Sequence, residues 1–277
     1  MKTILIVIAG MADLPDPFTA QDTPLSVAKT PALDMLARRG EILAVPPLSD
    51  FNEEISHKNA LLSLLGYDLG RGIPKMEELL EFGLNNSAAI NDFPSLRPFV
   101  IPAFSGHGVC LTTSAWVRGV AKCALIRPLD IYSPGSSDAE IADAIAQLVG
   151  NAVVNNEFVF IYIDSPLRAS LRGDYKAKIR ALEVLDRHLI SPVADFVWKS
   201  ELLINLAVTT DLITPWHRRQ PASLRVPVAL YFNNQDHEGD PDQRFTEVES
   251  MLNDSDMMDP SDLIRYLSNF NVEEEGD

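Results

Sequence analysis

The chain has 277 residues, of which 46% are hydrophobic and 22% charged, a composition typical of a globular protein and not of a disordered or fibrous one. The formal net charge of −16 argues against nucleic acid as a partner, because binding to phosphate backbones needs clustered Lys and Arg. No apolar run approaches the roughly 20 residues that span a bilayer, so no membrane insertion is expected.

Short apolar runs alternate with amphipathic segments along the chain. This alternation predicts an α/β fold with a mostly parallel sheet flanked by helices. The predicted strands, in chain order, are 3–8, 42–45, 108–112, 124–126, 158–163, 202–209 and 226–231. The predicted helices are 31–39, 59–65, 138–148, with Ser137 as its cap, and 174–193.

The predicted elements form one main domain over residues 1–232. A short excursion is expected near 75–107, because three prolines interrupt residues 85–104 and no helical or strand period is present there. Residues 233–277 hold 14 acidic side chains against Arg244 and Arg265, a net −12. We expect an acidic surface segment that ends in a flexible tail.

The residues that follow the first predicted strand and the two cysteines indicate the cellular compartment. The strand passes directly into Ala9-Gly10 and a polar stretch, which does not fit a signal peptide. Cys110 and Cys123 have neither metal-ligand spacing nor a disulfide framework. A reduced, cytoplasmic setting is therefore expected.

Three passages carry distinctive motifs. They are TPLSVAKTPALDMLA at 23–37, LSLLGYD at 62–68 followed by GRG at 70–72, and GDYKAKIRALE at 173–183. In residue pattern, order and spacing they resemble the archaeal-type cofactor-independent phosphoglycerate mutases of the alkaline phosphatase superfamily. The resemblance implies an alkaline phosphatase-like fold, and its motifs span most of the chain.

The same resemblance implies a chemistry that uses two divalent metals, commonly manganese or zinc, and a serine nucleophile. Here His57 stands at the place of that serine, between Ser56 and Lys58. Asp211 keeps the residue type of a ligand position. The other ligand positions are occupied by Ala9, Leu167, Leu171, Leu212 and Pro221.

Side chains of alanine, leucine and proline cannot coordinate a metal, so no metal and no other cofactor is expected. Only about thirty residues separate Met76 from Gly108, where the family has an insertion that forms a lid over the substrate, so the lid is lost or vestigial. We also expect Leu167, Leu171 and Leu212 to pack together as core and close the ancestral crevice.

Three functional interpretations follow. The preferred one is a catalytically degenerate phosphoglycerate mutase-like protein that binds or regulates an unidentified protein or small molecule. The second is a metal-independent phosphoryl-transfer or hydrolytic enzyme that uses a reworked site at Ser56, His57 and Asp211, with Lys58 beside them. The third is an active mutase. The sequence favours a protein without enzymatic activity but does not decide between the three interpretations.

Overall fold

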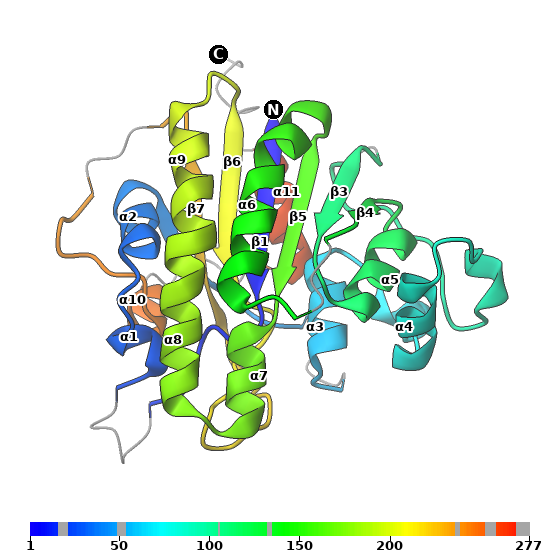
Figure 1. The fold of residues 1–277 in the computed structure, drawn as a ribbon, viewed down its shortest axis with the longest axis horizontal. Helices are drawn as coiled ribbons and strands as arrows, with labels where there is room; N and C mark the ends of the chain where they lie inside the picture. The colour runs from blue at the N-terminus through cyan, green and yellow to red at the C-terminus, as the bar shows by residue number, and fades with distance from the viewer. Residues whose placement is uncertain are drawn as a thin grey trace.

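A computed structural model describes residues 1–15, 22–48, 54–104, 106–131, 135–235, 239–252 and 259–269 (Figure 1). Its centre is a seven-stranded sheet with the order β2-β7-β6-β1-β5-β3-β4. Every neighbouring pair is parallel except those made by β7, which runs antiparallel to both β6 and β2. The strands are β1 (Lys2–Ile8), β2 (Glu41–Val45), β3 (Gly108–Leu111), β4 (Arg127–Leu129), β5 (Phe158–Ile163), β6 (Ile204–Thr209) and β7 (Val226–Phe232).

Helices cover both faces of this sheet, which confirms the predicted α/β class (Figure 1). The α-helices are α1 (Pro24–Val27), α2 (Pro31–Arg39), α3 (His57–Leu64), α4 (Met76–Leu84), α5 (Ala115–Cys123), α6 (Asp138–Asn155), α7 (Ser165–Arg172), α8 (Tyr175–Leu185), α9 (Ser191–Lys199), α10 (Glu247–Leu252) and α11 (Pro260–Asn269). Two 3-10 turns, η2 (Leu69–Arg71) and η3 (Ile90–Asp92), interrupt the loops around α4.

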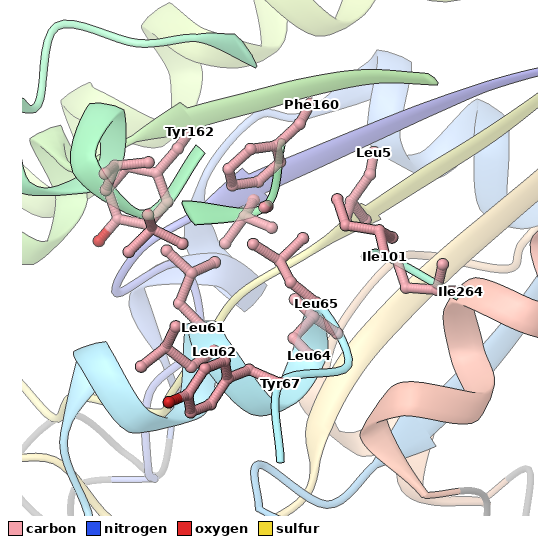
Figure 2. Packing of buried hydrophobic residues seen from close by; sticks show 14 of the residues in the cluster. Leu5, Leu61, Leu62, Leu64, Leu65, Tyr67, Ile101, Phe160, Tyr162 and Ile264 are labelled. Atoms are coloured by element: carbon pink, nitrogen blue, oxygen red, sulfur yellow. The ribbon is translucent and has the colours of Figure 1, made fainter. Parts of the chain in front are cut away.

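The two faces of the sheet bury two separate cores, because successive strand side chains point in opposite directions. On one face, Leu5 and Val7 of β1 pack with side chains of α3 and α11, such as Leu61 and Ile264 (Figure 2). On the other face, alternate residues of β1 pack against α2, α6, α8 and α9. Both faces of the central strands are therefore buried, as their nearly continuous apolar sequences predicted.

Most predicted boundaries agree with the structure to within a few residues, and one strand was wrong. Residues 124–126 do not form a strand, because Ala124 caps α5 and Leu125 has a positive φ of 58°. The strand begins at Arg127 instead. Ser137 does cap α6, by accepting a hydrogen bond from the Glu140 amide, but this helix continues seven residues beyond the predicted end at 148.

The long helix predicted over 174–193 is one continuous helical path through α8, a π-helical turn, η4 (Asp186–Ile190), and α9. Within the π-turn, the Asp186 carboxylate accepts hydrogen bonds from the amides of Ala32 and Leu33, at 3.1 and 2.9 Å. These amides open α2, whose own Thr30 makes no side-chain cap. Asp186 thus caps a helix from a distant part of the chain. Burial raises the pKa of Asp186 to about 6.

The C-terminal segment contributes to the core. Phe245 packs on one face of the sheet, and Leu263, Ile264 and Leu267 of α11 pack on the other. The Asn205 side-chain amide donates to the Leu267 carbonyl. The division of the chain at residue 232 stays a prediction, and the acidic stretch at 273–277 lies outside the described residues. Across the part of the chain that the structure describes, no helix combines the length and apolarity needed to cross a bilayer.

Helices α4 and α5 approach each other at two glycines. A Cβ built on Gly83 would lie 1.8 Å from the Ala115 carbonyl oxygen, and one on Gly119 would lie 2.0 Å from that of Leu79. Both distances are far below van der Waals contact. Glycine is therefore required at these positions for the helices to pack this closely.

We predict that Gly119→Ala lowers the free energy of unfolding by about 1–3 kcal/mol, because the methyl group forces α5 away from α4. The measurement is urea denaturation. The matched control is Gly150→Ala inside α6, where the new methyl group meets only Phe196 at ordinary contact distance. There the better helix propensity of alanine should stabilise the protein by about 0.5–1 kcal/mol. Equal effects of the two substitutions would contradict the packing argument.

Candidate functional site

The candidate site lies at one edge of the sheet. Strands β1, β5 and β6 run parallel and end at Ile8, Ile163 and Thr209. The residues that follow them, including Ala9 and Asp211, therefore gather where ligands bind in open α/β sheets. Helix α3 brings His57 to the same edge through its first turn.

His57 bridges two buried groups. Its Nδ1 lies 2.8 Å from Asp211 Oδ2, and its Nε2 lies 3.0 Å from Thr214 Oγ1. A carboxylate can only accept, so Nδ1 carries the hydrogen in this pair. Asp211 also accepts the Leu212 amide at 2.8 Å and a long hydrogen bond of 3.4 Å from the Tyr162 hydroxyl. Carboxylate, imidazole and hydroxyl thus form one hydrogen-bonded chain.

This chain is held inside the protein. The side chain of Asp211 is fully buried, Thr214 is 0% exposed, and the His57 side chain is 17% exposed. Burial disfavours the charged imidazole, and Lys178 nearby repels it, but the charge and the hydrogen bond of Asp211 outweigh both and raise the pKa of His57 above 6.5. Burial also raises the pKa of Tyr162 well above its ordinary value, and the Asp211 carboxylate adds to this effect.

The neighbours of His57 face other partners. Ser56 is the N-cap of α3, and its Oγ accepts the Asn59 amide at 3.2 Å. Lys58 donates from Nζ to the Pro74 carbonyl at 2.5 Å. Burial lowers the pKa of Lys58, although Glu54 and Glu77 oppose the shift. The structure therefore joins His57 to Asp211, while Ser56 and Lys58 make their hydrogen bonds elsewhere.

The apolar residues at the positions where the sequence resemblance predicts metal ligands differ in environment. Ala9 is buried, and beside it Gly10, with φ of 70°, leaves room for Leu167: a Cβ on Gly10 would lie 2.6 Å from the Leu167 Cα. Leu212 is 0% exposed. Leu171, in contrast, is 51% exposed, so the expectation that Leu167, Leu171 and Leu212 form one closed core is wrong for Leu171.

The two leucines of α7 lie in different turns. Leu167 and Leu171 are four residues apart, but Leu171 is next to the last helical residue, Arg172, and Gly173 follows with φ of 71°, so Leu171 lies at the exposed end of the helix. Ala169 and Ser170 of the second turn are buried, so α7 packs against the protein through these residues and leaves Leu171 outside the core. Pro221 is half-buried and precedes the bridge between Ile213 and Ala222.

A pair of divalent metals does not fit this set of side chains. Zinc and manganese centres need several thiolate, imidazole or carboxylate ligands, and a methyl or isobutyl group supplies none. Of the positions that the sequence resemblance predicts for metal ligands, Asp211 alone carries a suitable donor, and it already forms a hydrogen bond with His57. Among the residues that the structure describes, no group of three or more His, Cys, Asp and Glu side chains is arranged to hold a metal ion.

Sequence reasoning missed a second cluster at the same edge. The fully buried Lys178 donates to Asp13 Oδ2 at 2.7 Å and to the carbonyls of Ala12 and Thr214, each at 3.1 Å. Glu247 of α10 accepts the Asp13 amide at 2.8 Å and the Thr23 hydroxyl at 2.8 Å. Lys178 lies within the GDYKAKIRALE motif, so its place in the pattern was a signal, but nothing in the spacing paired it with Asp13.

Desolvation by burial has the largest effect on the pKa values of Lys178 and Glu247 in this cluster. It lowers the pKa of Lys178, against the attraction of Asp13, and raises the pKa of Glu247, against hydrogen bonds from its own backbone, Asp13 and Thr23. A fully buried ammonium persists only where charge and hydrogen bonds replace its hydration. Here one carboxylate and two carbonyls do so.

Comparison with known proteins shows the family of this chain. The model of the metalloenzyme superfamily matches residues 1–254. The chain belongs to the metalloenzyme superfamily. Within this superfamily it is similar to 2,3-bisphosphoglycerate-independent phosphoglycerate mutases, with 29% identity over 170 residues to that of Methanosarcina mazei and 25% over 161 residues to that of Methanothrix thermoacetophila.

These matches cover 59% and 58% of this superfamily member but only 41% and 40% of the two relatives, so the chain spans less than half of their length. Solved structures show the same fold over nearly the whole chain. The PH0037 protein of Pyrococcus horikoshii aligns with a TM-score of 0.73 at 21% identity, covering 97% of this chain and 96% of that one. A cofactor-independent phosphoglycerate mutase of Thermoplasma acidophilum aligns with a TM-score of 0.62 at 15% identity, covering 97% and 100%.

The first prediction from this site compares one substitution at two leucines. Leu212→His places an imidazole in a buried apolar position, and should lower the free energy of unfolding by more than about 2 kcal/mol. Leu171→His changes an exposed side chain and should stay within about 0.5 kcal/mol of the parent. Chemical denaturation measures both. Similar losses would show that the end of α7 packs more tightly than described.

The second prediction concerns pH. Because the pKa of His57 is raised in the folded state, protonation of the ring stabilises the fold. This contribution is complete below pH 6.5 and is lost as the pH rises through the folded-state pKa. The stability advantage of the parent over His57→Gln, from urea denaturation, should therefore shrink as the pH rises above 6.5.

The Asp211→Asn background supplies the control. There burial and Lys178 act on His57 without the opposing carboxylate, so the pKa should fall below 6.5. The pH dependence of the same comparison should then reverse its sign. An unchanged slope in that background would mean that Asp211 is not the source of the shift.

Proposed function

We propose that this protein is a binding or regulatory member of the phosphoglycerate mutase-like group, and that it does not carry out metal-dependent phosphoryl transfer. One observation carries the proposal: the edge where such chemistry would take place is filled by the protein's own side chains. Leu167 lies against Gly10, Leu212 is buried, and both ring nitrogens of His57 contact buried partners.

The partner we propose is a protein or a small molecule, and neither nucleic acid nor a membrane. Net charge supports the first exclusion, since −16 repels phosphate backbones. The cytoplasm is the proposed location, because Cys110 and Cys123 are free and buried, as in proteins of reducing compartments.

A metal-independent hydrolase is the second candidate. The observation that favours it is the chain Asp211, His57 and Thr214, since a carboxylate that orients an imidazole next to a hydroxyl is the arrangement that activates nucleophiles. Against it, the Thr214 hydroxyl is completely buried and the Ser56 hydroxyl caps α3. A substrate would have to open the structure to reach the Thr214 hydroxyl, and the half-buried Ser56 hydroxyl makes its hydrogen bond with the Asn59 amide and not with His57.

The test is a mutase assay on the purified protein with added manganese. We expect no interconversion of 3- and 2-phosphoglycerate and no stoichiometric manganese or zinc by elemental analysis, because Asp211 is the only donor among the aligned ligand positions. The Methanosarcina mazei phosphoglycerate mutase, assayed in parallel, is the positive control. Two metals per chain together with turnover would overturn the proposal.

Hydrolysis assays on the same purified protein distinguish the hydrolase from the proposed binding role. Hydrolysis of p-nitrophenyl phosphate or p-nitrophenyl acetate without metal, abolished by His57→Ala and by Thr214→Val, would support the hydrolase. The proposal expects no hydrolysis above the uncatalysed rate in any of these proteins. Hydrolysis that survives both substitutions would point to a contaminant and leave the hydrolase without support.

A further inference from the structure

A surface groove of about 960 Å³ lies away from the sheet edge described above. It is bordered by the turn that follows α3, by residues 97–104 and by α11. His57 begins α3, whereas Gly66 of the groove follows its last turn, so about 13 Å of helix separates them. The volume falls in the range that small-molecule sites occupy.

Three arginines line this groove, and each comes from a different part of the chain. Arg71 lies in η2, Arg97 begins the stretch 97–104, and Arg265 lies in α11. Their convergence is notable in a protein whose net charge is −16. The only acidic side chain among the lining residues is Asp68. With the Asp262 carboxylate that pairs with Arg265 counted as well, three guanidinium groups meet two carboxylates, so the groove still carries a local positive excess in an acidic protein.

The arginines keep hydrogen-bonding capacity for a ligand. Arg71 donates from Nε to Asp68, at 3.2 Å. Arg97 donates from Nη1 to the Pro94 and Leu96 carbonyls, both at 2.7 Å, and Arg265 donates from Nη1 to Asp262 at 2.8 Å. These contacts, among the described residues, occupy one nitrogen of each guanidinium. Planar guanidinium groups with further donors suit carboxylate and phosphate oxygens.

The apolar part of the groove is preformed. Tyr67 and Phe99 meet edge to face at 5.1 Å between ring centroids, and the Phe99 amide donates to the Cys123 carbonyl at 2.8 Å. Pro102 sits directly on Gly66, where a Cβ would lie 2.5 Å from the proline Cδ. These contacts fix residues 97–104 against the turn before any ligand arrives, which lowers the entropic cost of binding.

Two further features distinguish residues 97–104. Val100 is 58% exposed within the groove. Ala103 has φ of 65°, a left-handed conformation that costs a residue with a side chain roughly 1–2 kcal/mol. Strained backbone of this kind is concentrated at ligand-binding sites, where surrounding contacts maintain it.

From these observations we propose that the groove binds a small organic anion, which carries a phosphate or carboxylate group on an apolar body. The arginines hold the charged group, and Tyr67, Phe99 and Val100 contact the apolar body. This inference rests on the proposed binding role and assigns it a site and a class of ligand.

Isothermal titration calorimetry at low ionic strength tests the proposal with three probes: phenyl phosphate, benzoate and inorganic pyrophosphate. Saturable binding of phenyl phosphate or benzoate is expected, and whichever binds more tightly identifies the charged group. Pyrophosphate lacks the apolar body and should bind at least about fivefold more weakly than the better organic probe. No saturable binding of either organic probe, or equal affinity for pyrophosphate, would overturn the proposal.

Variants locate the site. Arg97→Gln and Arg265→Gln should each weaken binding of the organic probe at least about fivefold, a loss typical of a removed charge-assisted hydrogen bond. Arg180→Gln makes the same change of charge on the exposed surface of α8 and should leave the affinity unchanged. Equal losses in all three would indicate diffuse charge attraction and refute a site in the groove.

A further pair avoids charge removal. Val100→Glu puts a carboxylate at the exposed position and should abolish binding, whereas Val100→Ala should weaken it only slightly. Thermal melts of both should match the parent, because the side chain is exposed. Binding that survives Val100→Glu would contradict the proposal. These titrations are independent of the mutase assay, so turnover with manganese would overturn the proposed function and leave the assignment of the groove intact.

Discussion

The buried ion pair between Lys178 and Asp13 is the interaction on which the arrangement of the sheet edge depends. Lys178 comes from α8, Asp13 follows β1, and the Thr214 carbonyl that shares the ammonium follows β6. Glu247 of α10 attaches to the Asp13 amide. Removal of one partner from such a buried pair leaves an uncompensated charge, at a cost of roughly 3–5 kcal/mol. A single ammonium group and its acceptors therefore hold three segments that are distant in sequence in one geometry, and Glu247 joins a fourth to them.

This geometry reaches His57 in two ways. Lys178 binds the carbonyl of Thr214, the residue whose hydroxyl contacts His57, so the position of that hydroxyl depends on the ion pair. The ammonium also opposes protonation of the imidazole, while Asp211 favours it. The pKa of His57 is thus set by two opposing charges, Lys178 and Asp211, whose positions the fold fixes.

The sequence predicted the fold well because its signals are local. Apolar runs such as residues 158–163 and the motifs around α2, α3 and α8 specify elements from neighbouring residues alone. Residues 124–126 failed because a positive φ at Leu125 depends on how α5 ends, which no apolar pattern records. At the site, His57 and Asp211 were identified from the resemblance, but neither Thr214 nor Glu247 was given a role there. Their roles arise from contacts between segments 157 and 234 residues apart. Leu171 was wrongly placed in the core because the side of α7 that packs against the protein is a tertiary property, which the local pattern does not record.

The cap that Asp186 places on α2 has a consequence for the order in which the chain folds. A helix of nine residues is marginal by itself, and the amides at its first turn stay unsatisfied until the π-turn between α8 and α9 has docked. The contact joins residues more than 150 positions apart, so closing it carries a large loss of chain entropy that later contacts must offset. During synthesis on the ribosome, the motif at residues 23–37 emerges long before its capping carboxylate. The capping of α2 in the N-terminal third of the protein therefore depends on Asp186, which comes about two thirds of the way along the chain. The segment with β1, α2 and β2 is complete only after most of the chain has been synthesised.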